Sequence, residues 1–300
     1  MRNTWITPIT ALLTLAMQHP NPTAGAGGTV YRQQIEAWRR QREERLKADD
    51  GWLTVVGLAW LKPGVNRFGS DPASDVALPT SAPPHAGLFR VDGQQVTVEV
   101  APGVPVTFAG QPVTQRRLRS DADGADPDVL SLGPVTMQII ERGGRLAVRV
   151  KDRDSAARRQ FRGVKWYPIK PEYRIEARFV PHEKPTTIVV PSVVGIAEAM
   201  TSPGSALFEV GGRPMRLDPV LEPGSPQLFF IFRDATTGKT TYGSGRFLYA
   251  DPPANGRVVL DFNKAYSPPC AYTPHATCPL PPAQNHLPVA VEAGELDPPH

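Results

Sequence analysis

The sequence is poor in cysteine, in long apolar runs and in clustered histidine. Two cysteines among 300 residues are too few for a multi-cysteine metal cluster or a disulfide-dense scaffold. No apolar stretch approaches the roughly 20 residues that a helix needs to span a bilayer, so we expect no transmembrane span. The six histidines are scattered along the chain, so we expect neither a metal site nor a cofactor.

An excess of charge of one sign is also lacking. The 33 Lys and Arg residues and 29 Asp and Glu residues give a net charge of +4, and the two signs are mixed along the chain. This charge is too weak and too dispersed to indicate a nucleic-acid partner. A hydrophobic content of 40% with 21% charged residues is ordinary for a globular protein and excludes a disordered chain. The sequence contains no G-x-S-x-G, H-E-x-x-H, Walker A or G-x-G-x-x-G motif, so it names no reaction.

Residues 1–26 have features of a signal peptide. Arg2 is followed by a short, mainly apolar stretch from Trp5 to Met17, and Ala24-Gly25-Ala26 is a small-residue cleavage sequence. We therefore expect a periplasmic or secreted protein. Pro8 and several polar residues weaken the apolar segment, so a cytoplasmic protein is the alternative.

The next segment, residues 30–50, predicts a single N-terminal helix. Tyr31, Ile35, Trp38 and Leu46 fall near one face at helical spacing. We expect this stripe to pack on the body of the protein and the charged face to remain in solvent.

From residue 51 onward the pattern is that of β-strands. Val96–Val100 alternates strictly after the Asp92-Gly93 turn signal, and two further strand-like runs flank Arg142-Gly143-Gly144. Many short strands separated by Gly-rich turns predict an all-β fold, a mainly antiparallel sandwich or barrel-like arrangement. Gly195–Met200 is the one later segment with a short helical pattern.

The polar segment Asp121–Asp128 divides the β region. It predicts a small β unit over 51–125 and a larger one over 126–296, although a surface loop within one domain is the alternative. The last fifty residues hold 11 of the 34 prolines, which excludes central strands and helices there. Tyr and Leu residues interrupt the prolines, so we expect a long ordered loop laid across the β body.

Five polar residues near this loop are candidates for a site. Arg246 follows two glycines and offers a planar fork for a carboxylate or phosphate. Asp261 and Asn263 lie two residues apart and share a face, and Glu292 and Glu295 offer a second carboxylate pair. The site would hold a small polar or anionic ligand. The alternative is a buried ion pair of Arg246 with Asp261 or Glu295 that only fixes the loop.

Seven residues separate the two cysteines, Cys270 and Cys278. In an exported protein a disulfide is the default expectation, with free thiols as the next possibility. His275 and His286 would complete four zinc ligands, but at a spacing unlike that of the common structural zinc sites.

A set of longer and shorter motifs runs through the chain: Trp52-Leu53, Trp60-Leu61, Gly69-Ser70-Asp71, Trp166-Tyr167-Pro168, Phe232-Arg233-Asp234, Thr240–Leu248, Asp261–Tyr266, Pro268–Tyr272, Ala276–Pro282, Asn285 and Glu292–Glu295. The C-terminal motifs resemble the signature of the bacterial domain of unknown function 1684 family, and the shorter matches extend the resemblance over residues 30–296. His275 and His286 stand where the family pattern leads us to expect Tyr and Arg. The resemblance implies no activity.

The small β unit contains Phe68-Gly69-Ser70-Asp71, Asp75-Val76, Ser81 and His85. This pattern resembles a forkhead-associated domain, a β-sandwich that binds phosphothreonine peptides, but Arg67 precedes Gly69 instead of following it. Together these observations predict an exported bacterial protein with a polar pocket for a small anionic or polar ligand, and a hydrolase-like enzyme is one hypothesis for it. The alternative is a non-catalytic binding module or a structural module of the cell envelope.

Overall fold

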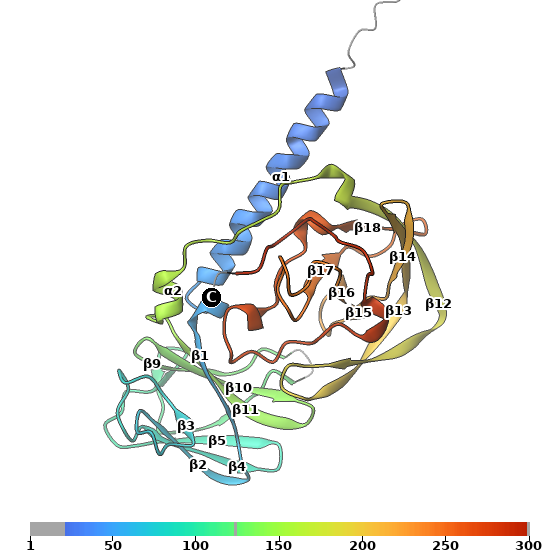
Figure 1. Ribbon diagram of the computed structural model, residues 1–300. Helices are drawn as coiled ribbons and strands as arrows, with labels where there is room; N and C mark the ends of the chain where they lie inside the picture. Colours follow the sequence, from blue (N-terminus) through green and yellow to red (C-terminus); the bar gives the residue numbers. More distant parts are fainter. Residues whose placement is uncertain (1–21, 123–124, 299–300) are drawn as a thin grey trace, which may run out of the picture.

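The computed structural model describes residues 22–122 and 125–298 of the chain. One long helix lies along a body made of two β units (Figure 1). Among the described residues, no helix is long and apolar enough to cross a membrane. The predicted signal peptide, residues 1–26, lies largely outside the described residues, so export remains a prediction.

Helix α1 (Pro22–Lys47) is the predicted N-terminal helix, but it begins before residue 30. Its N-terminal part projects from the body, whereas its C-terminal part packs against it (Figure 1). Ile35 and Leu46 of the predicted stripe are fully buried. The expected cleavage point after Ala26 falls inside this helix.

The first β unit is a sandwich of two sheets. One sheet has the strand order β1-β11-β10-β9-β6-β7 and the other has the order β3-β2-β4-β5-β8. A short 3₁₀ helix, η1 (Trp52–Thr54), leads into the unit. The strands are β1 (Val55–Trp60), β2 (Gly64–Gly69), β3 (Val76–Ala77), β4 (Gly87–Asp92), β5 (Gln95–Val100), β6 (Thr107–Phe108), β7 (Gln111–Pro112), β8 (Gln115–Leu118), β9 (Val129–Leu132), β10 (Val135–Arg142) and β11 (Arg145–Asp152).

One apolar core joins the two sheets of this sandwich. Phe68 and Phe89 come from one sheet, and Leu130, Met137 and Val148 come from the other. The predicted hairpin after residue 135 is present as β10 and β11, paired from Val135–Asp152 to Arg142–Arg145. Because β9, β10 and β11 pair into the same sheet as β1, the first unit extends to Asp152. The boundary that we placed at residues 125/126 therefore lies inside the first unit.

The second β unit contains two smaller sheets, with the orders β14-β13-β12-β18 and β15-β16-β17. Their facing sides and the C-terminal loop enclose a second core, which includes Phe230, Phe232, Leu248, Leu260 and Phe262. The strands are β12 (Arg174–Pro191), β13 (Ala197–Val210), β14 (Arg213–Leu217), β15 (Val220–Leu221), β16 (Leu228–Phe232), β17 (Arg246–Ala250) and β18 (Arg257–Asp261).

The segment with a short helical pattern, Gly195–Met200, is not a helix. Residues 197–200 begin strand β13, and Ala197 pairs with Pro191 of β12 while Met200 pairs with Ile188. The prediction was wrong because pairing with the long neighbouring strand outweighs a weak local preference.

The proline-rich C-terminal loop, residues 262–298, is ordered, as predicted. It contains three 3₁₀ turns, η4 (Phe262–Lys264), η5 (Pro269–Ala271) and η6 (Ala283–Asn285). Buried Asn285 fixes it to the sheets: its side chain accepts from the backbone of Asp218 at 2.8 Å and donates to the carbonyls of Asp218 at 2.9 Å and Ile231 at 3.0 Å. Side-chain hydrogen bonds thus replace the ladder that proline prevents.

The two β units are joined by residues 153–173, which contain α2 (Ala156–Gln160) and η3 (Pro171–Tyr173). This segment runs beside α1 (Figure 1). Arg39 of α1 donates to the carbonyl of Tyr167 at 3.1 Å, and Glu43 accepts from the backbone of Val164 at 3.1 Å. Helix α1 is therefore anchored to the connecting segment as well as to the second unit.

Candidate functional site

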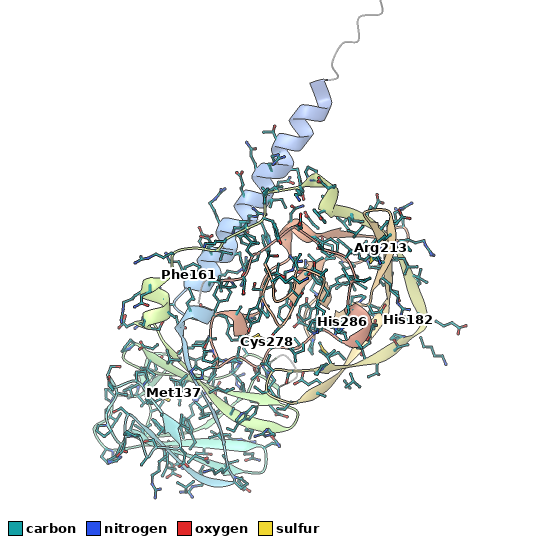
Figure 2. The ribbon with its side chains drawn as sticks, viewed as in Figure 1. Met137, Phe161, His182, Arg213, Cys278 and His286 are labelled. Carbon is teal, nitrogen blue, oxygen red and sulfur yellow. The ribbon has the colours of Figure 1, made fainter. Side chains whose placement is uncertain are left out.

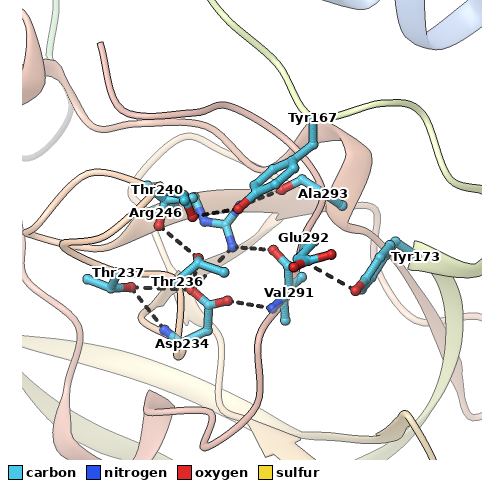
Figure 3. Close-up of polar contacts among 11 residues, drawn as sticks. Tyr167, Tyr173, Asp234, Thr236, Thr237, Thr240, Arg246, Val291, Glu292 and Ala293 are labelled. Carbon is cyan, nitrogen blue, oxygen red and sulfur yellow. Dashed lines mark hydrogen bonds and ion pairs between the residues drawn. The ribbon is translucent and has the colours of Figure 1, made fainter. Parts of the chain in front are cut away.

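Arg246, the cation of the predicted site, forms a closed buried cluster with Asp234 (Figure 3). Its side chain is fully buried, and Nη2 lies 3.3 Å from Oδ1 of Asp234. The guanidinium also donates to the carbonyls of Val291, at 3.0 Å, and Ala293. Burial lowers the pKa of Arg246, and the charge of Asp234 opposes that effect.

The carboxylate of Asp234 is equally occupied. It accepts from the backbone N–H of Val291 at 2.6 Å and from the hydroxyls of Thr236 at 2.8 Å and Thr237 at 3.3 Å. Nε of Arg246 has no hydrogen-bond partner among the described residues, but both charged side chains have zero exposure, which leaves no donor open to a ligand from solvent. The cluster ties the C-terminal loop to strands β16 and β17. Neither Asp261 nor Glu295, the partners that we expected for Arg246, makes this ion pair.

Glu295 takes part in a separate buried cluster on the side of α1. It is fully buried, lies 3.5 Å from Nε of Arg42 and accepts a hydrogen bond from the hydroxyl of Tyr272. Burial raises the pKa of Glu295, and the charge of Arg42 works against that shift. Arg42 also donates to the carbonyl of Ser267 at 2.9 Å. These contacts fasten the helix to the loop.

Asn263 and Glu292 also have structural partners. Asn263 is fully buried and grips the backbone of Lys170, accepting from its N–H at 2.9 Å and donating to its carbonyl at 2.8 Å. Exposed Glu292 lies 3.3 Å from Nζ of Lys170. Asn263 also donates to Oδ1 of Asp261, from its backbone at 3.3 Å and from its side chain at 3.4 Å. The five predicted residues therefore fall into three clusters, one of which holds Asp261, Asn263 and Glu292, and do not converge on one site.

Asp261 is the predicted residue that borders a groove. Its Oδ1 accepts from the hydroxyl of Tyr31 on α1 at 2.8 Å. Burial contributes most to raising the pKa of Tyr31, and the neighbouring Asp261 carboxylate raises it further. This hydrogen bond joins the end of β18 to α1 at one side of the groove.

The groove lies between α1 and strands β12, β17 and β18, and we call it the α1 groove. Its volume is about 1020 Å³, at the upper end of the range of about 300–1,000 Å³ for small-molecule sites. Its lining residues are Trp38, Arg42, Arg45, Arg174, Glu176, Gln227, Tyr249, Ala250, Asp251, Pro252, Ala254, Asn255, Arg257, Val258, Val259, Asp261, Lys264 and Tyr266.

The three carboxylates of the α1 groove are all occupied. Glu176 lies 3.5 Å from Nε of Arg257, Asp251 accepts from Gln227 at 3.0 Å, and Asp261 is held by Tyr31. The groove has five cationic side chains. Of these, Arg45, Arg174 and Lys264 form no ion pair with any residue that the structure describes. Because its five cations exceed its three carboxylates, the lining of the groove has an excess of positive charge.

Aromatic rings form the inner part of the α1 groove. The ring centroid of Tyr266 lies 6.2 Å from that of Trp38 and 6.4 Å from that of Tyr249, with which it is nearly parallel. The Arg42 guanidinium lies 4.5 Å from the Tyr266 ring centre. Burial raises the pKa of Tyr266 to about 12, so its hydroxyl stays protonated at neutral pH. Planar surfaces beside free cations can hold a molecule with both a flat and an anionic part.

The predicted disulfide is absent from the structure. Both Cys270 and Cys278 are free thiols, although the backbone N–H of Cys270 donates to Sγ of Cys278 at 3.2 Å. Across residues 22–122 and 125–298, no three His, Cys, Asp or Glu side chains are grouped so as to hold a metal ion. The prediction of a bridge was wrong for the state described, while the two side chains are neighbours.

Sequence reasoning missed most of the groove because its residues come from distant segments. Arg45 and Arg174 are 129 positions apart and Arg174 and Lys264 are 90 positions apart, and only the fold brings them together. One local signal was available: Trp38, Arg42 and Arg45 follow one another at helical spacing and lie on one face of α1. That face was interpreted as packing and solvated surface, not as the wall of a site.

Comparison with known proteins adds a family but no activity. Residues 159–296 match the model of the family described as "Protein of unknown function (DUF1684)". The resemblance that we noted upstream of residue 159 has no counterpart in that match. A comparison with curated proteins found none that matches this chain.

Two solved structures illustrate what the chain is similar to. The solution NMR structure of an uncharacterized protein from Haloarcula marismortui has 35% sequence identity and a TM-score of 0.40, covering 46% of this chain and 78% of that one. A structure from an analysis of phosphothreonine-dependent FHA domain interactions has 21% identity and a TM-score of 0.22, covering 31% of this chain and 92% of that one.

Proposed function

This chain belongs to the DUF1684 family, and since that membership assigns no activity, we propose from the α1 groove that the protein binds a small anionic ligand with a planar group. The observation that carries the proposal is the set of three cations, Arg45, Arg174 and Lys264, that border the groove without ion-pair partners among the described residues. A ligand carboxylate or phosphate would supply the missing negative charge.

Binding without catalysis fits this arrangement better than hydrolysis. A hydrolytic site needs a free base or nucleophile beside the bound ligand. The carboxylates that border the α1 groove, Glu176, Asp251 and Asp261, are each engaged by a protein donor. The predicted acid Glu295 is buried behind Arg42 and Tyr272. The groove thus offers cations and rings, the elements of recognition.

The location of the protein forms a second part of the proposal. We infer export to the periplasm or the exterior from the N-terminal pattern of residues 1–26. Expression of the full chain in a bacterium followed by mass measurement tests this inference. Loss of the first 26 residues from the extracellular or periplasmic fraction is the expected result, and an intact chain in the cytoplasm would contradict it.

A titration with simple probes tests the groove. Phenyl phosphate, inorganic phosphate and phenol separate the contributions of ring and charge. We expect phenyl phosphate to bind most tightly, and its affinity to fall as salt is raised, because solvent-exposed cations are screened. Isothermal titration calorimetry measures each affinity directly.

Two variants locate the binding. Arg45→Gln removes a cation that has no structural partner, so we expect the affinity for phenyl phosphate to fall about tenfold, equivalent to about 1.4 kcal/mol, with folding unchanged. Arg117→Gln is the matched control, because Arg117 is an exposed cation on β8 of the other β unit. Equal affinity in both variants and the wild type would place the ligand elsewhere.

A further inference from the structure

Strand β18 is an edge of the sheet β14-β13-β12-β18 and borders the α1 groove. Among the described residues, β12 is its one strand partner. The opposite edge of the sheet is β14, which lies on the side away from α1, where Arg213 is labelled (Figure 2). That edge contains Pro214, which has no N–H to offer to a further strand. The sequence of β18 contains no proline, so the edge at the groove lacks this protection.

The backbone of β18 points alternately toward β12 and toward the groove. The N–H of Phe179 on β12 donates to the carbonyl of Gly256 at 2.8 Å. In an antiparallel pair such bonds recur at every second residue, so Val258 and Leu260 make the hydrogen bonds to β12. The odd-numbered residues of β18 therefore turn their N–H and C=O groups away from β12.

Two of these odd-numbered residues show what the free side of β18 offers. Arg257 exchanges two backbone hydrogen bonds of 2.9 Å with Ala254, which lines the groove. Val259 follows in the same phase, and no residue that the structure describes bonds its N–H or C=O on that side. Its side chain is 38% exposed. One backbone donor and one backbone acceptor thus face the groove, which is the requirement for a peptide to add as a strand.

Positive charge beside β18 favours an acidic peptide. The lining of the groove has five cations and three carboxylates, and Arg45, Arg174 and Lys264 form no ion pair with any residue that the structure describes. Arg174 of β12 lies opposite Asp261, two residues after Val259. Because alternate residues of a strand share a face, the side chains of Arg174 and Val259 lie on the same face of the sheet. A peptide carboxylate on that face would lie beside a cation.

Aromatic rings border the groove on the side of the neighbouring sheet. Tyr249 belongs to β17, whose sheet packs against the other face of β18 around one core. Its ring centroid lies 6.4 Å from that of Tyr266, which in turn lies 6.2 Å from that of Trp38 on α1. Successive side chains of an added strand point to opposite faces. An aromatic residue between two acidic residues would therefore face these rings.

We propose that the α1 groove binds an extended acidic segment of another protein as an additional strand on the free edge of β18. This inference rests on the proposed function and names its ligand: side-chain carboxylates supply the anionic part and an aromatic side chain supplies the planar part. The backbone of the segment donates to the carbonyl of Val259 and accepts from its N–H. The turn of residues 254–257 ends the open edge on one side, and the Tyr31–Asp261 hydrogen bond ends it on the other, so the paired stretch is short.

Three capped peptides test the ligand by isothermal titration calorimetry on the full chain. Acetyl-Glu-Phe-Glu-amide should bind, and acetyl-Lys-Phe-Lys-amide should bind at least about tenfold more weakly, because like charges would meet in the groove. The acidic peptide methylated on its backbone nitrogens should lose its affinity, and equal affinity would overturn strand addition. If phenyl phosphate binds and no acidic peptide does, this inference fails while the proposed function stands. If neither binds, both fail.

Two substitutions at Val259 test the edge itself. Val259→Pro removes the N–H that faces the groove and leaves the hydrogen bonds to β12 in place, because Val258 and Leu260 make them. The affinity for acetyl-Glu-Phe-Glu-amide should fall by about tenfold, since a peptide carbonyl loses its donor. Val259→Thr keeps the N–H and should retain most of the affinity. Equal losses in the two variants would show that the side chain, not the backbone, holds the peptide.

Two further measurements on the wild type do not depend on the folding of Val259→Pro. Hydrogen exchange followed by nuclear magnetic resonance should slow at the Val259 amide when acetyl-Glu-Phe-Glu-amide is added, and unchanged exchange there would overturn the proposal. Light scattering gives the mass of the protein in solution. A dimer of the wild type that Val259→Pro converts to a monomer would also overturn it, because a second copy of the chain would then occupy the edge.

Discussion

Arg246 decides between two interpretations of the C-terminal loop, a ligand site and a buried ion pair that fixes the loop. A ligand-binding arginine is accessible to its ligand, whereas this one has zero exposure, pairs with Asp234 and donates to two carbonyls of the loop. The geometry favours the structural role. It also explains why the loop can be ordered despite its prolines, because the arginine satisfies carbonyls that no strand pairs with.

Arg246→Met should therefore be strongly destabilising and should leave the α1 groove intact. The change leaves the Asp234 carboxylate buried without its ion-pair partner, and breaking a buried pair in this way costs about 3–5 kcal/mol. Urea unfolding measures the loss, and Arg117→Met, an exposed arginine, should change stability by less than about 0.5 kcal/mol. A loss of under about 1 kcal/mol for Arg246→Met would contradict the structural role.

Because Glu295 is a buried carboxyl group, we expect the free energy of unfolding to depend on pH. Burial raises its pKa in the folded state above the ordinary value of 4.5. Between the ordinary and the raised pKa, the folded state binds more protons than the unfolded state. The free energy of unfolding that depends on Glu295 therefore falls as the pH rises through this window.

Glu295→Gln keeps the shape of the side chain but removes the titration. The stability of the wild type minus that of the variant should accordingly fall as the pH rises above 4.5. Urea midpoints of both proteins, measured from about pH 4 to about pH 8, give this difference, in which the other titrating groups cancel. A difference that is constant would show that Arg42 balances the burial, and one that grows with pH would show that Arg42 outweighs it; either would contradict the raised pKa.

At the scale of elements, strand β17 depends on the backbone that precedes it. Gly245 has a φ of +89°, and a Cβ there would lie 2.6 Å from the Phe232 carbonyl oxygen and from Cγ of Pro281. Glycine at this position lets the chain turn into β17 directly beneath the C-terminal loop. Gly243, two residues earlier, has open space around it.

The two glycines form a matched pair for mutation. Gly245→Ala should destabilise the protein by at least about 1–3 kcal/mol, the cost of holding a side chain in a strained backbone conformation. Gly243→Ala should change stability by less than about 0.5 kcal/mol. Thermal unfolding of both variants provides the comparison, and equal melting temperatures would refute the argument from close approach.

For the molecule as a whole, the contacts between the units indicate that they unfold together. The Thr273 hydroxyl of the second unit donates to the carbonyl of Val55 in the first at 3.0 Å, and Trp52 packs on the core cluster around Cys278. Arg158 donates to the carbonyl of Lys47 at the end of α1 at 2.7 Å. These links bind the helix, the first unit and the loop of the second.

Leu130→Ala and Leu248→Ala test this cooperativity, because each removes a fully buried leucine from a different core. Each should cost about 2–5 kcal/mol and should lower protection in both units equally. Hydrogen exchange followed by mass spectrometry resolves the units separately. Loss of protection confined to the mutated unit would show that the two cores are independent.

The family, the β-class and the ordered loop could be predicted from the sequence, since they depend on local patterns. Alternation at period two fixes which residues of a strand share a face, and turn glycines fix where the chain reverses. The hairpin of β10 and β11 and the buried stripe of Ile35 and Leu46 follow from such patterns. Each needs information from only a few neighbouring residues.

The site and the pairing of charges were decided by the tertiary structure alone. The sequence argument offered Arg246 two partners, Asp261 and Glu295. Packing selected a third carboxylate, that of Asp234. The α1 groove likewise depends on a helix meeting strands that lie far along the chain. Composition determines which charges exist, whereas burial and distance determine which of them are neutralised, and these two quantities are set only when the units pack.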